Sequence, residues 1–212
     1  MKLIGMLDSP YVRRVAISMH LLGLRFEQES VSVFRGFAQF QKINPIVKAP
    51  SFICDDGTVL MDSTLILEYA EALARPRSLV PADVPGLQRE LRLIGLALAA
   101  CEKSVQIVYE RNTRPSDKQH EPWVERVTGQ MLAALGALDT ELAARPLGAT
   151  SGSMTQAGVS AAVVWEFVRQ VQPELALATT FPALAAFAAQ AEQLAEFKAA
   201  PHGDSTYRQA GA

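Results

Sequence analysis

Two patterns of apolar and polar positions divide this chain of 212 residues. Residues 1–75 mix short apolar runs with segments in which apolar side chains return every three or four positions. A mixture of this kind is typical of alternating strands and helices. After residue 86, Ala and Leu dominate at helical spacing and no alternating strand pattern is found. The pattern therefore predicts an α/β region followed by an all-helical region.

The first three elements are expected close to the N-terminus. Leu3 lies in an apolar run that suits a buried strand. A helix is expected to begin after Ser9, with Pro10 in its first turn, and to end at the glycine cap Gly23. A looser alternation over residues 26–33 indicates a second strand.

A hairpin is expected further along the chain. The sequence Asp-Asp-Gly at 55–57 lies between two apolar runs, 51–54 and 58–61, and Asp-Gly in such a position is a strong signal for a tight turn. Residues 62–74 then carry apolar side chains at helical spacing. The expected order is βαβ, a variable stretch, and ββα.

Three prolines interrupt helical continuation between residues 75 and 86 (RPRSLVPADVPG). We therefore expect a linker at 76–86, between an N-terminal domain at 1–75 and an all-helical C-terminal domain at 87–212. The helices of the second domain are expected at 87–112, 121–145, 155–171 and 182–199.

Composition narrows the set of partners. The formal net charge is −2 and no cluster of Lys and Arg is present, so neither nucleic acid nor an anionic membrane is favoured as a partner. The N-terminal residues lack the long apolar segment of a signal peptide, and no apolar run reaches membrane-spanning length. We expect a cytoplasmic protein.

Cysteine and histidine positions predict neither a disulfide framework nor a metal site. Cys54 and Cys101 are far apart and form no motif of a zinc site or a dithiol redox centre. His20, His120 and His202 have no spacing typical of metal ligands. The sequence therefore predicts no bound metal.

Three motifs follow one another in the α/β half: SPYVRRV at the first helix, NPIVKAP before the hairpin, and Asp62-Ser63 at the next helix. Together with the proline-rich linker and the helical half, they resemble the cytosolic glutathione transferases, in particular bacterial members with a serine-type site. YERNTRP and PWVER extend the resemblance over essentially the whole chain. It implies a thioredoxin-like first domain, a helical-bundle second domain, and glutathione bound at their junction.

Ser9 has two compatible interpretations. A serine followed by a proline is a favourable helix start, and the same geometry directs helix N–H groups and the positive end of the helix dipole toward an anion. The resemblance implies that Ser9 is the catalytic hydroxyl, which donates a hydrogen bond to the glutathione sulfur and lowers the pKa of the thiol. Tyr11 and Ser18 are other hydroxyls nearby, and Tyr11 is interpreted as core packing.

The segment before the hairpin is expected to hold the middle and the glycyl end of glutathione. The resemblance implies a cis peptide bond at Pro50, which turns the backbone of Ala49 toward the cysteinyl unit. Alanine stands where the family more often has valine, and a backbone contact tolerates that change. Lys48 is a candidate for the glycyl carboxylate, although an exposed lysine is by default solvated.

Asp62 and Ser63 are expected to cap their helix and, by the resemblance, to bind the γ-glutamyl end of glutathione. Ser63 and the helix amides take the carboxylate, and Asp62 faces the ammonium. The family more often has glutamate at the acid position. Arg13 and Arg14 are interpreted as solvated charges on an exposed helix face and are left out of the site.

The helical half departs from the family at one position. Gly158 occupies the place of the aspartate in the usual Thr-x-x-Asp capping box, so Thr155 alone caps this helix and a weaker helix start is expected. Candidates for the second-substrate pocket are Tyr109, Asn112 and Trp165, although aromatic residues at helical spacing more often belong to the core.

The resemblance implies a glutathione transferase that attacks an electrophilic, largely apolar substrate with the glutathione thiolate, and a homodimer. Three alternatives stay open at this point. One is a non-catalytic glutathione-binding or regulatory protein of the same fold. The others are a glutathione-dependent lyase or isomerase, and a peroxidase or reductase, which the absence of a cysteine near Ser9 disfavours.

Overall fold

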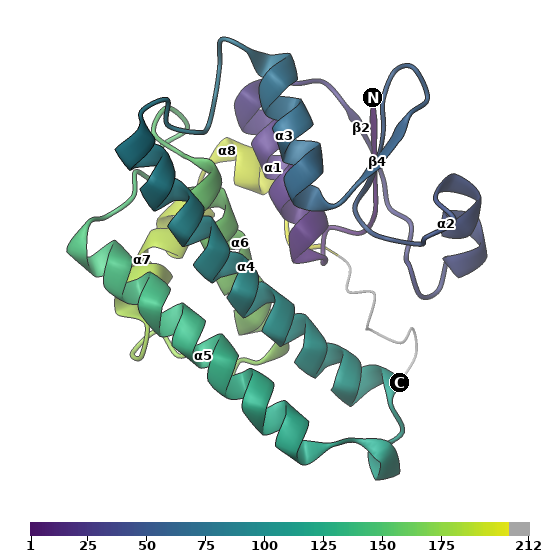
Figure 1. Cartoon of the computed structure of the whole chain (residues 1–212), viewed down its shortest axis with the longest axis vertical. Coiled ribbons are helices and arrows are strands. Elements are labelled where there is room, and N and C mark those ends of the chain that lie inside the picture. Colours follow the sequence, from purple (N-terminus) through teal and green to yellow (C-terminus); the bar gives the residue numbers. More distant parts are fainter. Residues whose placement is uncertain (204–212) are drawn as a thin grey trace. The chain divides into compact units, whose positions relative to one another are not determined.

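The structure is a computed structural model that describes residues 1–203 (Figure 1). These residues form two compact units. One comprises residues 1–79 together with the described residues from Leu194 onward, and the other comprises residues 80–193. Each unit is described by itself below.

The first unit is built on a four-stranded sheet of order β2-β1-β3-β4. Strand β1 pairs in parallel with β2 and antiparallel with β3, and β4 is antiparallel to β3. This order confirms the expected βαβ–ββα thioredoxin-like arrangement, while the variable stretch forms the short helix α2. The elements are β1 (Lys2–Ile4), α1 (Pro10–Leu22), β2 (Glu27–Glu29), α2 (Phe37–Ile43), β3 (Ser51–Ile53), β4 (Val59–Met61), α3 (Ser63–Ala74) and α8 (Ala195–Ala199).

Helix α1 has the limits predicted from the sequence. Ser9 is its N-cap residue, Pro10 is its first residue, and Gly23 ends it with a φ of 72°, in the left-handed region that glycine adopts readily. The N–H of Gly23 donates to the carbonyls of His20 and Met19. The chemistry of these two caps therefore fixes where the helix begins and ends.

The C-terminal end of the described chain differs from the prediction, because α8 belongs to the first unit and not to the helical one. The guanidinium of Arg13 explains this placement. Its Nε donates to the carbonyl of Ala200 at 2.9 Å, and its Cζ lies 5.8 Å from the centre of the Phe197 ring, within range of a cation–π contact. The domain limits expected at 75 and 87 stay a prediction.

The second unit contains only helices among its described residues. Helix α4 packs against α5 and α6, and α7 packs against α5 and α6. The predicted helical bundle is confirmed, but the helix expected over 182–199 is broken after Ala191. None of the helices formed by residues 1–203 has both the length and the apolar character needed to cross a membrane. The elements are α4 (Val84–Thr113), the short 3-10 helix η1 (Ser116–Lys118), α5 (Glu121–Ala144), α6 (Gln156–Val171) and α7 (Pro182–Ala191).

The start of α6 is better supported than the sequence predicted. Thr155 caps it by accepting a hydrogen bond from the N–H of Gly158 at 3.2 Å. In addition, the buried carboxylate of Glu90 on α4 accepts from the N–H of Ala157 at 2.6 Å. A carboxylate from a neighbouring helix therefore stands at the helix start, where the positive end of the dipole favours it.

Candidate functional site

Contacts within the first unit bring the three sequence motifs together. A Cβ atom at Gly5, just after β1, would lie 2.6 Å from Cγ2 of Val12 and 3.3 Å from Cβ of Ala49, so α1 and the segment before the hairpin meet at the end of β1. The Nζ of Lys48 lies 3.4 Å from Oδ2 of Asp62, which joins that segment to the start of α3. The predicted glutathione-binding residues therefore lie in one region of this unit.

The geometry of Ser9 suits both of its interpretations. Its backbone is extended, at φ −72° and ψ 121°, and its N–H donates to the carbonyl of Met6. Its Oγ accepts from the N–H of Val12 at 3.5 Å, which is long for a capping bond. Ser9 is partly exposed, and its hydroxyl keeps its own proton for donation. Ser18, one of the alternative hydroxyls, is fully buried, and Tyr11 is partly buried.

A chain of hydrogen bonds holds the segment between α2 and β3. The Nδ2 of Asn44 donates to Oγ of Ser51 at 2.8 Å, and this hydroxyl donates to the carbonyl of Lys48 at 2.8 Å. Oδ1 of Asn44 accepts from the N–H of Ile46 at 3.0 Å. The Ala49-Pro50 peptide bond is cis, as the resemblance implies. Asn44 and Ser51 were missed from the sequence, although Asn before Pro is a recognisable turn signal.

Replacing Asn44 with alanine is expected to loosen this segment. The change removes three hydrogen bonds at a buried position, one of them to the sulfur of Met61, so we expect a loss of about 1–2 kcal/mol in the free energy of unfolding. The dissociation constant for glutathione, the ligand that the resemblance implies, is expected to rise, because the backbone of Ala49 is less well held. Urea unfolding and isothermal titration calorimetry measure the two effects, and an unchanged dissociation constant in a destabilised variant would contradict the second.

The start of α3 combines a helix cap with an ion pair. Asp62 is the N-cap residue, and its Oδ1 accepts from the N–H of Thr64 at 3.0 Å. Its backbone adopts φ 72° and ψ 123°, and a positive φ is uncommon for a residue other than glycine. The ion pair with Lys48 is about half exposed on both sides, so its contribution to stability is small. Both charged groups are accessible to a ligand.

The interpretation of Arg13 and Arg14 as solvated charges is wrong, because both side chains are buried. Arg13 binds the segment around α8, as described above. Nη1 of Arg14 donates to Oγ of Ser63 at 3.2 Å and to Oγ1 of Thr64 at 3.3 Å. Helix α1 is enclosed on nearly all sides, which its sequence pattern did not reveal, and a cation therefore lies beside the first hydroxyls of α3.

In the second unit, two candidates for the second-substrate pocket, Tyr109 and Asn112, belong to α4, and the third, Trp165, belongs to α6. Burial raises the pKa of the Tyr109 phenol, which lines a surface pocket of about 410 Å³. Asn112 Nδ2 donates to the carbonyl of Val108 in its own helix, and Trp165 is buried edge-to-face against Phe181. The described residues that line the pocket are Glu102, Val105, Gln106, Tyr109, Glu110, Thr113, Arg114 and Trp123.

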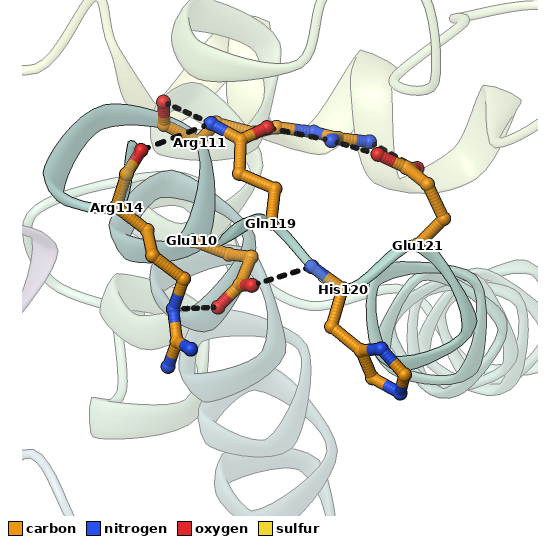
Figure 2. Close-up of polar contacts among 6 residues, drawn as sticks. All are labelled: Glu110, Arg111, Arg114, Gln119, His120 and Glu121. Atoms are coloured by element: carbon orange, nitrogen blue, oxygen red, sulfur yellow. Dashed lines mark hydrogen bonds and ion pairs between the residues drawn. The ribbon is translucent and has the colours of Figure 1, made fainter. Parts of the chain in front are cut away.

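A polar cluster holds the turn between α4 and α5 beside this pocket (Figure 2). The buried carboxylate of Glu110 accepts from the N–H of His120 at 2.8 Å and pairs with Nε of Arg114 at 3.1 Å. Arg111 binds the carboxylate of Glu121 with both terminal nitrogens, and this hydrogen bonding lowers the pKa of Glu121. The cluster fixes the end of α4 relative to the start of α5.

Within residues 1–203, no group of three or more His, Cys, Asp and Glu side chains is placed to hold a metal ion. Cys54 and Cys101 are both buried, and neither forms a disulfide bond. The arrangement around Ser9 instead offers hydroxyls, helix N–H groups and single charges, which suit a small ligand carrying carboxylates and an ammonium.

Family models match both units. The description "Glutathione S-transferase, N-terminal domain" matches residues 3–78, and "Glutathione S-transferase, C-terminal domain" matches residues 121–190. Together these matches cover well over half of the chain. The chain belongs to the glutathione S-transferase family. The thioredoxin-like sheet and the helical bundle are the two parts of that family's fold.

Individual relatives agree with this assignment. The chain is 27% identical over 176 residues to the uncharacterized GST-like protein YibF of Escherichia coli, covering 82% of this chain and 85% of YibF. It is 26% identical to a maleylacetoacetate isomerase of Pseudomonas aeruginosa, covering 65% of this chain and 69% of the isomerase. A glutathione transferase family member of Pseudomonas fluorescens Pf-5, solved with bound S-(propanoic acid)-glutathione, is 27% identical with a TM-score of 0.78, covering 94% of this chain and 98% of the other.

Proposed function

We propose that this glutathione S-transferase family member conjugates glutathione to an electrophilic, largely apolar small molecule, and that Ser9 stabilises the glutathione thiolate. The observation that carries the proposal is the position of Ser9. It lies at the N-cap of α1 with a long 3.5 Å capping bond, so its O–H and the helix dipole are both available to an anion. Ser9 donates a hydrogen bond to the sulfur and is not the nucleophile.

The other residues of this region bind the tripeptide in the same proposal. The backbone of Ala49, before Pro50, pairs with the cysteinyl unit. Ser63 takes the γ-glutamyl carboxylate, Asp62 faces the ammonium, and Lys48 contributes to the glycyl carboxylate. The bound thiolate then attacks the electrophilic carbon, and a carbon–sulfur bond forms. In a substitution, the leaving group departs with the electron pair of its broken bond. In an addition, the electron pair of the attacked double bond moves to an acceptor group, which then takes up a proton. Tyr109, Asn112 and Trp165 of the second unit are the proposed contributors to the second-substrate site.

An ultraviolet difference titration tests the proposal directly. Reduced glutathione is added to the protein at several pH values, and the thiolate absorbance is followed. We expect a thiolate band near neutral pH, below the range in which the free thiol ionises, and turnover of an electrophile such as 1-chloro-2,4-dinitrobenzene. Glutathione binding with no thiolate band and no turnover would instead support a non-catalytic binding protein.

An isomerase is the second candidate function, favoured by the similarity to the maleylacetoacetate isomerase reported above. In such a reaction the same thiolate adds to an activated double bond, rotation follows, and the thiolate is expelled, so no glutathione is consumed. A cis-to-trans assay on a maleyl substrate, with total glutathione measured before and after, separates isomerisation from conjugation. A homodimer is also proposed, and a monomer in sedimentation velocity would contradict it.

A further inference from the structure

The hydrogen bonds from Arg14 to the start of α3 restrict the direction in which two hydroxyl groups can donate their protons. A guanidinium has only donors, whereas a serine or threonine hydroxyl has one donor and two acceptor lone pairs. Nη1 of Arg14 donates to Oγ of Ser63 at 3.2 Å and to Oγ1 of Thr64 at 3.3 Å. Both hydroxyls therefore act as acceptors toward Arg14, and the proton of each is directed away from it.

The position of these hydroxyls suits an anionic ligand group. Ser63 is the first residue of α3, where backbone N–H groups lack partners within the helix and the dipole is positive. A hydrogen bond from a charged donor also polarises the hydroxyl that accepts it and strengthens its own donation. Because Arg14 is 2% exposed, its guanidinium is held in one place by the packing of α1.

We infer that Arg14 is a positioning residue that commits the hydroxyls of Ser63 and Thr64 to donating to the α-carboxylate of the γ-glutamyl end of glutathione. The inference rests on the proposed function and deepens it. Arg14 acts through the two hydroxyls and touches no reacting atom. It sets the preference of the protein for a ligand that carries this carboxylate and leaves the thiolate chemistry at Ser9 unchanged.

The test compares two ligands in three proteins by isothermal titration calorimetry. The ligands are glutathione and γ-aminobutyryl-cysteinyl-glycine, which lacks only the α-carboxylate. The proteins are the wild type, Arg14→Met and the matched control Arg13→Met, which removes a buried guanidinium of the same helix that binds Ala200 instead. We expect Arg14→Met to lose about tenfold in affinity for glutathione, or about 1.4 kcal/mol, and little for the analogue.

Kinetics give a second readout that a general loss of stability would not produce. KM for glutathione is expected to rise about tenfold in Arg14→Met with kcat unchanged. Arg13→Met is expected to keep the wild-type preference for glutathione over the analogue. If Arg14→Met does not fold, Arg14→Lys replaces it, because its ammonium keeps the charge but ends one bond short of Nη1, and a selective loss for glutathione is again expected.

The outcomes separate this inference from the proposed function. If Arg14→Met or Arg14→Lys retains the wild-type preference, or loses both ligands equally, the role of Arg14 is overturned and the transferase proposal stands. If the wild type binds neither ligand, the proposed function is overturned and this inference with it. A selective loss in the Arg14 variant alone supports both.

Discussion

Replacing Ser9 with alanine is expected to lower kcat for glutathione conjugation about 100-fold, the typical effect of removing one hydrogen-bond donor from a catalytic anion. The reason is that the thiolate loses the O–H donor at the N-cap of α1 and its pKa rises toward that of free glutathione. At neutral pH a smaller fraction of bound glutathione is then ionised. The pH at which the thiolate band appears should shift to the alkaline side by the same cause.

The Ser9→Ala variant is expected to lose much of its activity and little of its stability. The capping bond from Val12 to Ser9 is long, so its loss should cost no more than about 1 kcal/mol in the free energy of unfolding. Ser9→Thr is the matched control, because it keeps a hydroxyl at the N-cap and should retain a larger part of kcat. Initial rates across pH and urea unfolding measure both quantities. An alanine variant with wild-type kcat and an unshifted thiolate band would show that Ser9 is only a helix cap.

The helix limits and the hairpin of the first unit could be predicted because short sequence signals determine these conformations. Serine before proline, glycine after the last turn, and Asp-Gly between apolar runs each have one dominant local conformation, and the structure shows a helix with these limits and a hairpin at this place. The order of strands and helices along the chain was then predicted from the spacing of apolar residues. Short segments were harder, since α2 was not predicted and β2 is only three residues long.

What sequence reasoning missed depends on contacts between distant residues. Arg14 and Ser63 are 49 positions apart, and Glu90 and Ala157 are 67 positions apart. A charged residue on a helix is usually exposed, so this general rule predicted an exposed side chain for Arg14, which is buried. It is buried because α1 is covered by α3 and α8 as well as by the sheet, and the position of α8 was itself unpredicted.

Replacing Glu90 with alanine is expected to lower the free energy of unfolding by about 3 kcal/mol, the upper range for a hydrogen bond to a charged group. The variant leaves the N–H of Ala157 buried without its acceptor, and it removes a negative charge from the positive end of α6. Urea unfolding measures the change as a lower midpoint at constant slope.

Two control variants isolate the carboxylate. Glu90→Gln keeps a carbonyl acceptor of nearly the same shape and is expected to lose about 1 kcal/mol, since only the charge is removed. Glu102→Ala removes an exposed carboxylate from the same helix and is expected to change stability by less than about 0.5 kcal/mol. Equal losses from Glu90→Ala and Glu102→Ala would contradict the capping role of Glu90.

A family-type capping box cannot replace this contact from within α6. A Cβ atom at Gly158 would lie 2.7 Å from Sδ of Met154 and 3.2 Å from the Phe187 ring, so an aspartate there needs those side chains to move. Adding Gly158→Asp to Glu90→Ala is therefore expected to lower stability further rather than restore it. Restoration would mean that Met154 repacks easily and that local capping outweighs the close contact. An acid that comes from α4, as Glu90 does, requires no additional space at Gly158.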